Sequence, residues 1–180
     1  MMKANVQDRY GSPDEVLQLK EIDKPVVGDD DVVVRVRAAS VHPDVWHVVT
    51  GRPWVLRLMG AGLHRPKNPV PGTDVAGGVE SVGKNVTRFR PGDEVFGETH
   101  IENQWWNGGA FAEYASVPQD VLAHKPNNVT FEQAAAVPTS GFIALHNLQS
   151  AGSMRPGQNV LINGAGGGVG AISWCSYVVS

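Results

Sequence analysis

The sequence predicts a mainly β fold that ends in the first elements of an α/β unit. Glycine and proline are abundant, with 21 Gly and 12 Pro in 180 residues, and such residues divide a chain into short strands and turns. Residues 31–40 alternate apolar and charged side chains, which is the period of a strand buried on one face. Near the end, an apolar run at 160–162 precedes a glycine-rich turn, the order in which a βαβ unit begins.

Strands dominate the first part of the chain. Residues 3–7 and 16–21 flank a turn at 11–14 and predict a hairpin. After the strand at 31–40, a short helix is expected from Pro43 to just before Gly51. Four further short strands are expected, at 75–82, 93–96, 111–117 and 121–124. Many short strands with turns between them indicate a barrel or a sandwich.

The connection over residues 52–69 is more apolar than a solvated loop should be. Long loops of this kind often shape a binding pocket. We therefore expect its tryptophan, Trp54, to contribute to such a pocket.

The pattern changes after residue 125, so we place a domain boundary there, with one domain over 1–125 and a second over 126–180. Thr130 is the expected N-cap of a helix that continues through the alanines that follow. A second helix is expected over 140–149. A turn at 155–158 then leads into a buried strand at 160–162 and the glycine turn.

Composition excludes several classes of partner. The 15 basic and 18 acidic residues are interspersed, so no basic stripe is available for a nucleic acid backbone. Residues 160–180 carry no charge, but their glycines disfavour a membrane-spanning helix, and we expect no membrane partner. One cysteine, Cys175, cannot form an internal disulfide, and the first ten residues contain no signal core. A cytoplasmic protein is expected.

The glycine turn is the first candidate binding site. Asn163 is followed by Gly164, Ala165, Gly166, Gly167, Gly168, Val169 and Gly170. Glycines there permit a tight turn and let backbone N–H groups approach a pyrophosphate at a helix N-terminus. Ala165 stands where a strict G-x-G-x-x-G pattern ending at Gly170 has its first glycine. A glycine-rich loop without a ligand is the alternative.

Six stretches occur in a telling order: AASVHPDVW at 38–46, PVPGTDVAGGVESVG at 69–83, FRPGDEVFG at 89–97, GGAFAEYASVP at 108–118, AAAVPTSGFIALHNL at 134–148 and VLINGAGGGVG at 160–170. Together they resemble the zinc-free, quinone oxidoreductase-like branch of the medium-chain dehydrogenase/reductase family. The resemblance implies a GroES-like β-barrel followed by a Rossmann domain that binds NADPH or NADH. It also implies a quinone, enone or other carbonyl substrate in the cleft between the domains.

The same resemblance predicts that zinc is absent. Zinc-dependent relatives carry a cysteine after the long strand and a histidine in a Gly-His-Glu segment, whereas this chain has His42 and Thr73-Asp74 there. A catalytic zinc needs three good protein ligands, and the single cysteine excludes a four-cysteine site. His42 and His47 would point to different sides of a helix, so they do not form a metal site with Asp44.

The resemblance also suggests site residues. His42 stands where zinc-free relatives commonly have Asn near the nicotinamide, and with Asp44 it is the candidate catalytic group, because a neutral imidazole can orient a carbonyl or donate a proton. A surface histidine without a role is the alternative.

With His42, the aromatic side chains expected to line a substrate pocket are Trp46, Trp54 and Trp105; they could instead close the barrel end. Thr139 and Ile143 fall in the segment that approaches the nicotinamide, where relatives have Thr in place of Ile143.

Ten residues follow Gly170, and none is charged. A dinucleotide site normally has the residue that reads the ribose about 20 positions beyond this turn. We therefore expect a truncated form or fragment with little or no turnover, whose parent transfers a hydride from NADPH. The alternatives are a non-catalytic GroES-like module, which could form a homodimer, and a zinc-dependent alcohol dehydrogenase.

Overall fold

The strand that the sequence predicts most clearly lies at the centre of the main sheet. The computed structural model describes residues 1–100, 108–150 and 159–179. In it, β3 (Asp31–Ala39) pairs antiparallel with β4 (Asp74–Val82) and with β6 (Tyr114–Pro118). Val32 and Val34 are completely buried while Arg35 is exposed, as expected for a strand with one face on the core.

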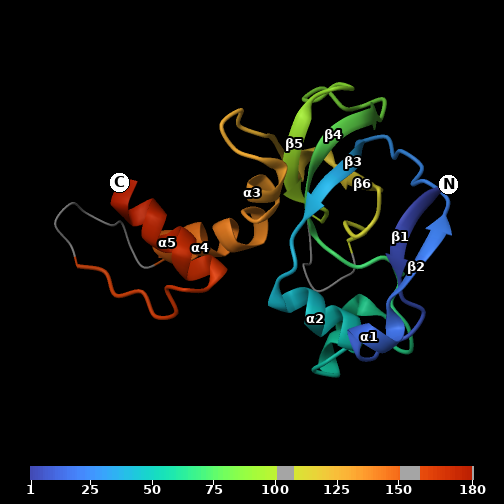
Figure 1. Cartoon of the computed structure of the whole chain (residues 1–180), viewed down its shortest axis with the longest axis horizontal. Coiled ribbons are helices and arrows are strands. Elements are labelled where there is room, and N and C mark those ends of the chain that lie inside the picture. Colours follow the sequence, from blue (N-terminus) through green and yellow to red (C-terminus); the bar gives the residue numbers. More distant parts are fainter. Residues whose placement is uncertain (101–107, 151–158, 180) are drawn as a thin grey trace. The chain divides into compact units, whose positions relative to one another are not determined.

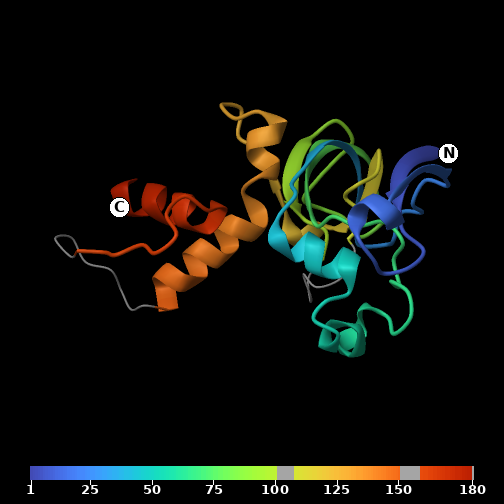
Figure 2. The same ribbon diagram turned by 60° about the horizontal axis from the view of Figure 1, so that its bottom comes forward.

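Two more strands complete a five-stranded antiparallel sheet. β5 (Glu94–Glu98) and β7 (Leu122–His124) extend it to the order β6-β3-β4-β5-β7. The register between β3 and β4 shifts twice, and such irregularities bend strands. The strands curl around a common interior (Figures 1 and 2). That interior is filled mainly by valines together with Phe89 and Leu122.

The predicted hairpin forms a separate two-stranded sheet. β1 (Met2–Val6) and β2 (Gln18–Ile22) pair antiparallel. The connection is a single helical turn, α1 (Pro13–Val16), rather than the simple turn predicted at 11–14. Proline at the first helical position and the acidic residues after it favour this helix start.

The predicted helix after β3 is present as α2 (Pro43–Thr50), and it ends at Gly51 with φ of 64°. Val45 and Val49 of α2 pack on Val16 of α1. The long connection that follows contains a π-helical turn, η1 (Arg57–Ala61), which the sequence does not predict.

The chain divides into two compact units, unit 1 over Met1–Ala135 and unit 2 over Ala136–Ser180. Unit 1 includes the short 3-10 helix η2 (Gln119–Val121) and α3 (Phe131–Ala135). Two alanines of α3 pack with Ala76 of β4, so this helix belongs to the sheet unit.

Helix α3 begins with the predicted Thr130 cap. The Thr130 hydroxyl accepts from the Gln133 N–H at 3.2 Å, and the Thr130 N–H donates to Gln133 Oε1 at 2.9 Å, which is a reciprocal capping box. The N–H of Glu132 itself and the Thr130 hydroxyl also donate to the Glu132 carboxylate, and they lower its pKa.

Replacing Thr130 with alanine is expected to destabilise unit 1 by about 1 kcal/mol. It should also raise the pKa of Glu132 toward its usual value, because one of its two donors is lost. Because the pKa of Glu132 is lower in the folded than in the unfolded chain, its carboxylate stabilises the fold when the pH is above the unfolded-state pKa. This contribution is lost as the pH falls through the folded-state pKa. Urea unfolding and an NMR titration of Glu132 measure both effects. If the Glu132 pKa is the same in the unaltered chain and in the Thr130 variant, the Thr130 hydroxyl does not donate to the Glu132 carboxylate.

Unit 2 contains α4 (Pro138–Ser150) and α5 (Gly168–Val179), which pack on each other. The strand predicted at 160–162 is wrong: these residues have no regular structure, and Leu161 is 95% exposed. A strand needs a hydrogen-bonded neighbour, and every strand of the described residues lies in unit 1. The predicted turn at 155–158 lies outside the described residues.

No helix in the described part of the chain has the length and apolar character that crossing a bilayer requires.

Candidate functional site

The pairing of β3 with β4 brings His42 to Thr73. Ala39 at the end of β3 lies opposite Val75 near the start of β4. In an antiparallel pair, the residues that follow one strand therefore meet those that precede the other. His42 and Thr73, 31 positions apart in sequence, form a hydrogen bond at this place.

One ring nitrogen of His42 is hydrogen-bonded, and the other is buried without a hydrogen-bond partner among the described residues. Its Nε2 lies 2.8 Å from Thr73 Oγ1, and its side chain is only 9% exposed. Nδ1 is buried and has no hydrogen-bond partner among the described residues, although Asp44 Oδ2 lies 3.5 Å away. A nearby carboxylate favours the tautomer with the proton on Nδ1, in which Nε2 accepts from the Thr73 hydroxyl.

Further polar groups lie buried beside this contact. Asp74 is 1% exposed and accepts a hydrogen bond of 2.9 Å from the Ser40 hydroxyl. The N–H of Thr99 donates to the Thr73 carbonyl at 2.8 Å, while the buried Thr99 hydroxyl has no partner in the described residues. Polar groups are buried at a cost unless they are hydrogen-bonded, so this end of β4 is built around polar contacts.

Sequence reasoning did not assign Ser40, Thr73 or Thr99 to the site. Thr73 and Asp74 were considered only as replacements for zinc ligands. The one available signal was their position in the resemblance, because nothing in the sequence states which residues lie opposite His42. As predicted, His47 points elsewhere: its Nδ1 donates to the Arg52 carbonyl at 2.8 Å.

The predicted glycine turn forms in unit 2 and leads into α5. Gly164 has φ of 78°, a conformation that favours glycine, and the N–H of Gly167 donates to its carbonyl at 3.0 Å. A Cβ on Gly170 would lie 2.3 Å from that same carbonyl oxygen. Residues 163–168 are exposed, so the N-terminus of α5 is accessible to an anion.

Helix α4 contributes to the surroundings of the same turn. A Cβ on Gly168 would lie 2.6 Å from the Ser140 hydroxyl, so α4 and the start of α5 are in close contact. Thr139 is buried and Ile143 is half-buried on α4. Both α4 residues predicted for the cofactor therefore belong to the unit that contains the glycine turn.

The predicted aromatic pocket residues are exposed. Trp46 and Trp54 are about half exposed, and Trp105 lies outside the described residues. Their role in a substrate pocket stays a prediction. Among the described residues, no group of three or more His, Cys, Asp or Glu side chains is placed to hold a metal ion.

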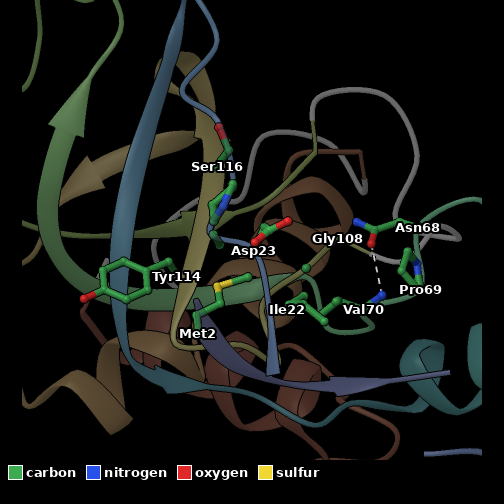
Figure 3. Close-up of a pocket in the computed structure, with 12 residues that line it drawn as sticks. Met2, Ile22, Asp23, Asn68, Pro69, Val70, Gly108, Tyr114 and Ser116 are labelled. Carbon is green, nitrogen blue, oxygen red and sulfur yellow. Dashed lines mark hydrogen bonds between the residues drawn. The ribbon is translucent and has the colours of Figure 1, made fainter. Parts of the chain in front are cut away.

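Two hollows in unit 1 lie apart from His42. Figure 3 shows one of about 260 Å³ between the β1–β2 hairpin, residues 68–70 and β6, where Asn68 Oδ1 accepts from the Val70 N–H at 3.0 Å. Its lining combines apolar side chains with polar ones, among them Asp23 and Ser116. The other, of about 380 Å³, is lined by Lys24, Arg35, Arg37, Glu113 and Tyr114 among others. Neither includes a tryptophan or any residue of the His42 cluster.

Comparison with known proteins defines the class of protein to which this chain belongs. Residues 28–127 match the family model described as the alcohol dehydrogenase GroES-like domain. The chain is 33% identical to a 2-methylene-furan-3-one reductase from Solanum lycopersicum, over 95% of this chain and 42% of that protein. The structure resembles the quinone oxidoreductase from Coxiella burnetii, with a TM-score of 0.82 and 31% identity over 96% of this chain and 51% of that one. A mycobacterial protein solved in complex with NADPH has a TM-score of 0.78 and 28% identity, over 98% and 50% of the two chains.

These matches confirm the predicted fold class, a GroES-like barrel followed by the start of a Rossmann domain. The chain belongs to the medium-chain dehydrogenase/reductase family, in its quinone oxidoreductase-like branch. It spans about half the length of the curated relatives it matches.

Proposed function

We propose that the whole protein is an NAD(P)H-dependent oxidoreductase that reduces a quinone, an enone or another carbonyl compound. The observation that carries this proposal is the glycine turn at the start of α5, where Gly164 has a positive φ and Gly170 has no room for a side chain. Such a turn suits a pyrophosphate at a helix N-terminus. The names of the relatives, a furanone reductase and quinone oxidoreductases, support the substrate class.

The residues Gly164 to Gly170 would hold the dinucleotide. A Cβ on Gly166 would meet no atom within 4 Å, so the backbone there is open to a ligand, and the helix dipole of α5 favours the negative phosphates. Thr139 and Ile143 of α4 would lie toward the nicotinamide ring. When bound, the cofactor supplies the hydride. The cofactor would be NADPH or NADH, since one neighbour was solved with NADPH and another is named an NAD-dependent alcohol dehydrogenase.

His42 would act on the substrate oxygen. Thr73 contacts Nε2, and the buried Nδ1 has no hydrogen-bond partner among the described residues, so Nδ1–H would be the group that meets a carbonyl oxygen entering this site. To transfer its proton the ring would start protonated on both nitrogens and end as a neutral imidazole, and the Asp44 carboxylate at 3.5 Å would stabilise the protonated form. Thr73 is then a positioning residue, since it fixes the ring orientation.

In the whole protein, we expect His42→Ala to lower kcat/KM by about 100-fold, the scale of a lost proton donor. His42→Asn should lose less, because the amide still donates a hydrogen bond. The measurement is quinone-dependent oxidation of NADPH across a pH series, with Thr73→Val as the test of positioning. Full activity of the alanine variant would remove His42 from the mechanism.

A non-catalytic GroES-like binding or dimerisation module is the second candidate, because residues 28–127 match the GroES-like domain. A fluorescence titration of the 180-residue chain with NADPH separates the two. Saturable micromolar binding with quinone-dependent NADPH oxidation would exclude the module; no saturable binding would exclude enzyme activity for this chain.

The proposal extends to the metal content of the protein, its location, its oligomeric state and its domain boundary. We propose chemistry without zinc, and metal analysis that finds one zinc per chain would instead favour an alcohol dehydrogenase. A cytoplasmic location, a possible homodimer and a domain boundary at residue 125 stay predictions.

A further inference from the structure

The helical turn around η1 exposes its apolar face. Residues 55–61 are helical, with a π-helical turn over Arg57–Ala61, and its exposed apolar side chains are Val55, Leu58 and Met59. They are 51%, 60% and 54% exposed. A surface helix normally turns its apolar side chains toward the core. We call these three side chains the outward face.

The opposite side of the turn is fastened to unit 1. Leu56 is buried, and the Arg57 guanidinium lies over the Tyr10 ring, 4.4 Å from its centroid. Arg57 Nε donates to the Gly51 carbonyl at 3.1 Å, and the Tyr10 hydroxyl donates to the Gly62 carbonyl at 2.7 Å. These contacts prevent the turn from rotating to bury Val55, Leu58 and Met59.

The chain segment that carries the outward face has only basic charged residues. No Asp or Glu occurs between Asp44 and Asp74, whereas this stretch contains Arg52, Arg65 and Lys67, all exposed. Trp54, directly before the face, and Leu63, shortly after it, are exposed as well. Two copies of the same cationic surface would repel each other, so self-association through this face is disfavoured.

We propose that the outward face docks on an anionic phospholipid surface. Apolar side chains that enter the headgroup region, with basic residues beside them, are the chemistry of interfacial membrane binding. In both Figure 1 and Figure 2 this segment lies at the periphery of unit 1, next to α2, and it lines neither of the two described hollows. A projecting face suits insertion into a bilayer surface better than it suits a peptide ligand. The sequence alone predicts no membrane partner, because it does not show this exposure.

Co-sedimentation of the 180-residue chain with vesicles tests the proposal. We expect binding to vesicles that contain phosphatidylglycerol and much weaker binding to pure phosphatidylcholine. The double variant Leu58→Asp/Met59→Asp should reduce the binding to anionic vesicles by about tenfold or more. Arg52→Glu/Arg65→Glu should also reduce it, and added salt should weaken the binding of the unaltered chain.

Leu19→Asp is the control for the introduced charge, because Leu19 is an exposed apolar residue (68%) on β2 and is not part of the outward face. It should bind vesicles as the unaltered chain does, and thermal unfolding checks that every variant is folded. Absence of binding by the folded chain, equal binding to neutral vesicles, or equal losses in the Leu19 variant would overturn the proposal. Self-association lost on Leu58→Asp would assign the face to a second copy instead. The assay needs neither NADPH nor turnover, so its outcome is independent of the proposed function.

Discussion

Replacing Gly77 with alanine is expected to destabilise unit 1 by about 3 kcal/mol, the upper part of the usual range for overpacking. Gly77 lies in β4, where it pairs with Val36 and Val95. An added Cβ would lie 2.1 Å from the Arg35 carbonyl oxygen. This oxygen belongs to the backbone of β3, so it cannot move away as a flexible side chain can. The two central strands would have to separate, which also disturbs the valine core between them.

The next residue provides the control. A Cβ on Gly78 would meet no atom within 4 Å, so Gly78→Ala should change stability by no more than about 1 kcal/mol, and it can increase it by restricting the unfolded chain. Urea unfolding with a shared m-value compares the two variants. Equal stabilities of Gly77→Ala and Gly78→Ala would show that β3 and β4 do not approach as closely as described.

Replacing Gly170 with alanine is expected to weaken NADPH binding by about ten- to a hundredfold. The added Cβ would lie 2.3 Å from the Gly164 carbonyl oxygen and 2.7 Å from the Ala165 Cα, so the turn must open. If this distortion costs about 1.4 to 2.8 kcal/mol, affinity falls by about ten- to a hundredfold. The fluorescence titration proposed above measures the change.

Gly166→Ala is the companion variant for the glycine turn. It introduces the same methyl group two residues after Gly164, but in open space, and it should leave the turn intact and retain most of the affinity. A Gly170 variant that binds as tightly as the Gly166 variant would contradict a pyrophosphate site at the start of α5.

Local signals predicted most of unit 1. The alternation of residues 31–40 became β3, the Pro43 and Gly51 signals bounded α2, and the Thr130 cap started α3. Each of these features depends on neighbouring residues, through side-chain period or through caps. The helical turns α1 and η1 were missed, because four or five residues carry too little periodicity to be recognised.

The site was predicted only in part for a related reason. His42 was identified from its position in a resemblance, yet its partner Thr73 became apparent only from the β3–β4 register. The conformation of the glycine turn was predicted, since its backbone demands are local to residues 164–170, while its role in cofactor binding stays a prediction.

The sequence by itself determined where strands, caps and the glycine turn lie in this protein, because periodicity and turn chemistry act over a few residues. Only the tertiary structure decided three other matters: that residues 160–162 form no strand, that Thr73 holds His42, and that Val55, Leu58 and Met59 face outward. Each of these depends on what lies across from a residue in space. Strand pairing, ring orientation and burial are properties of contacts between distant segments, and a linear pattern does not contain them.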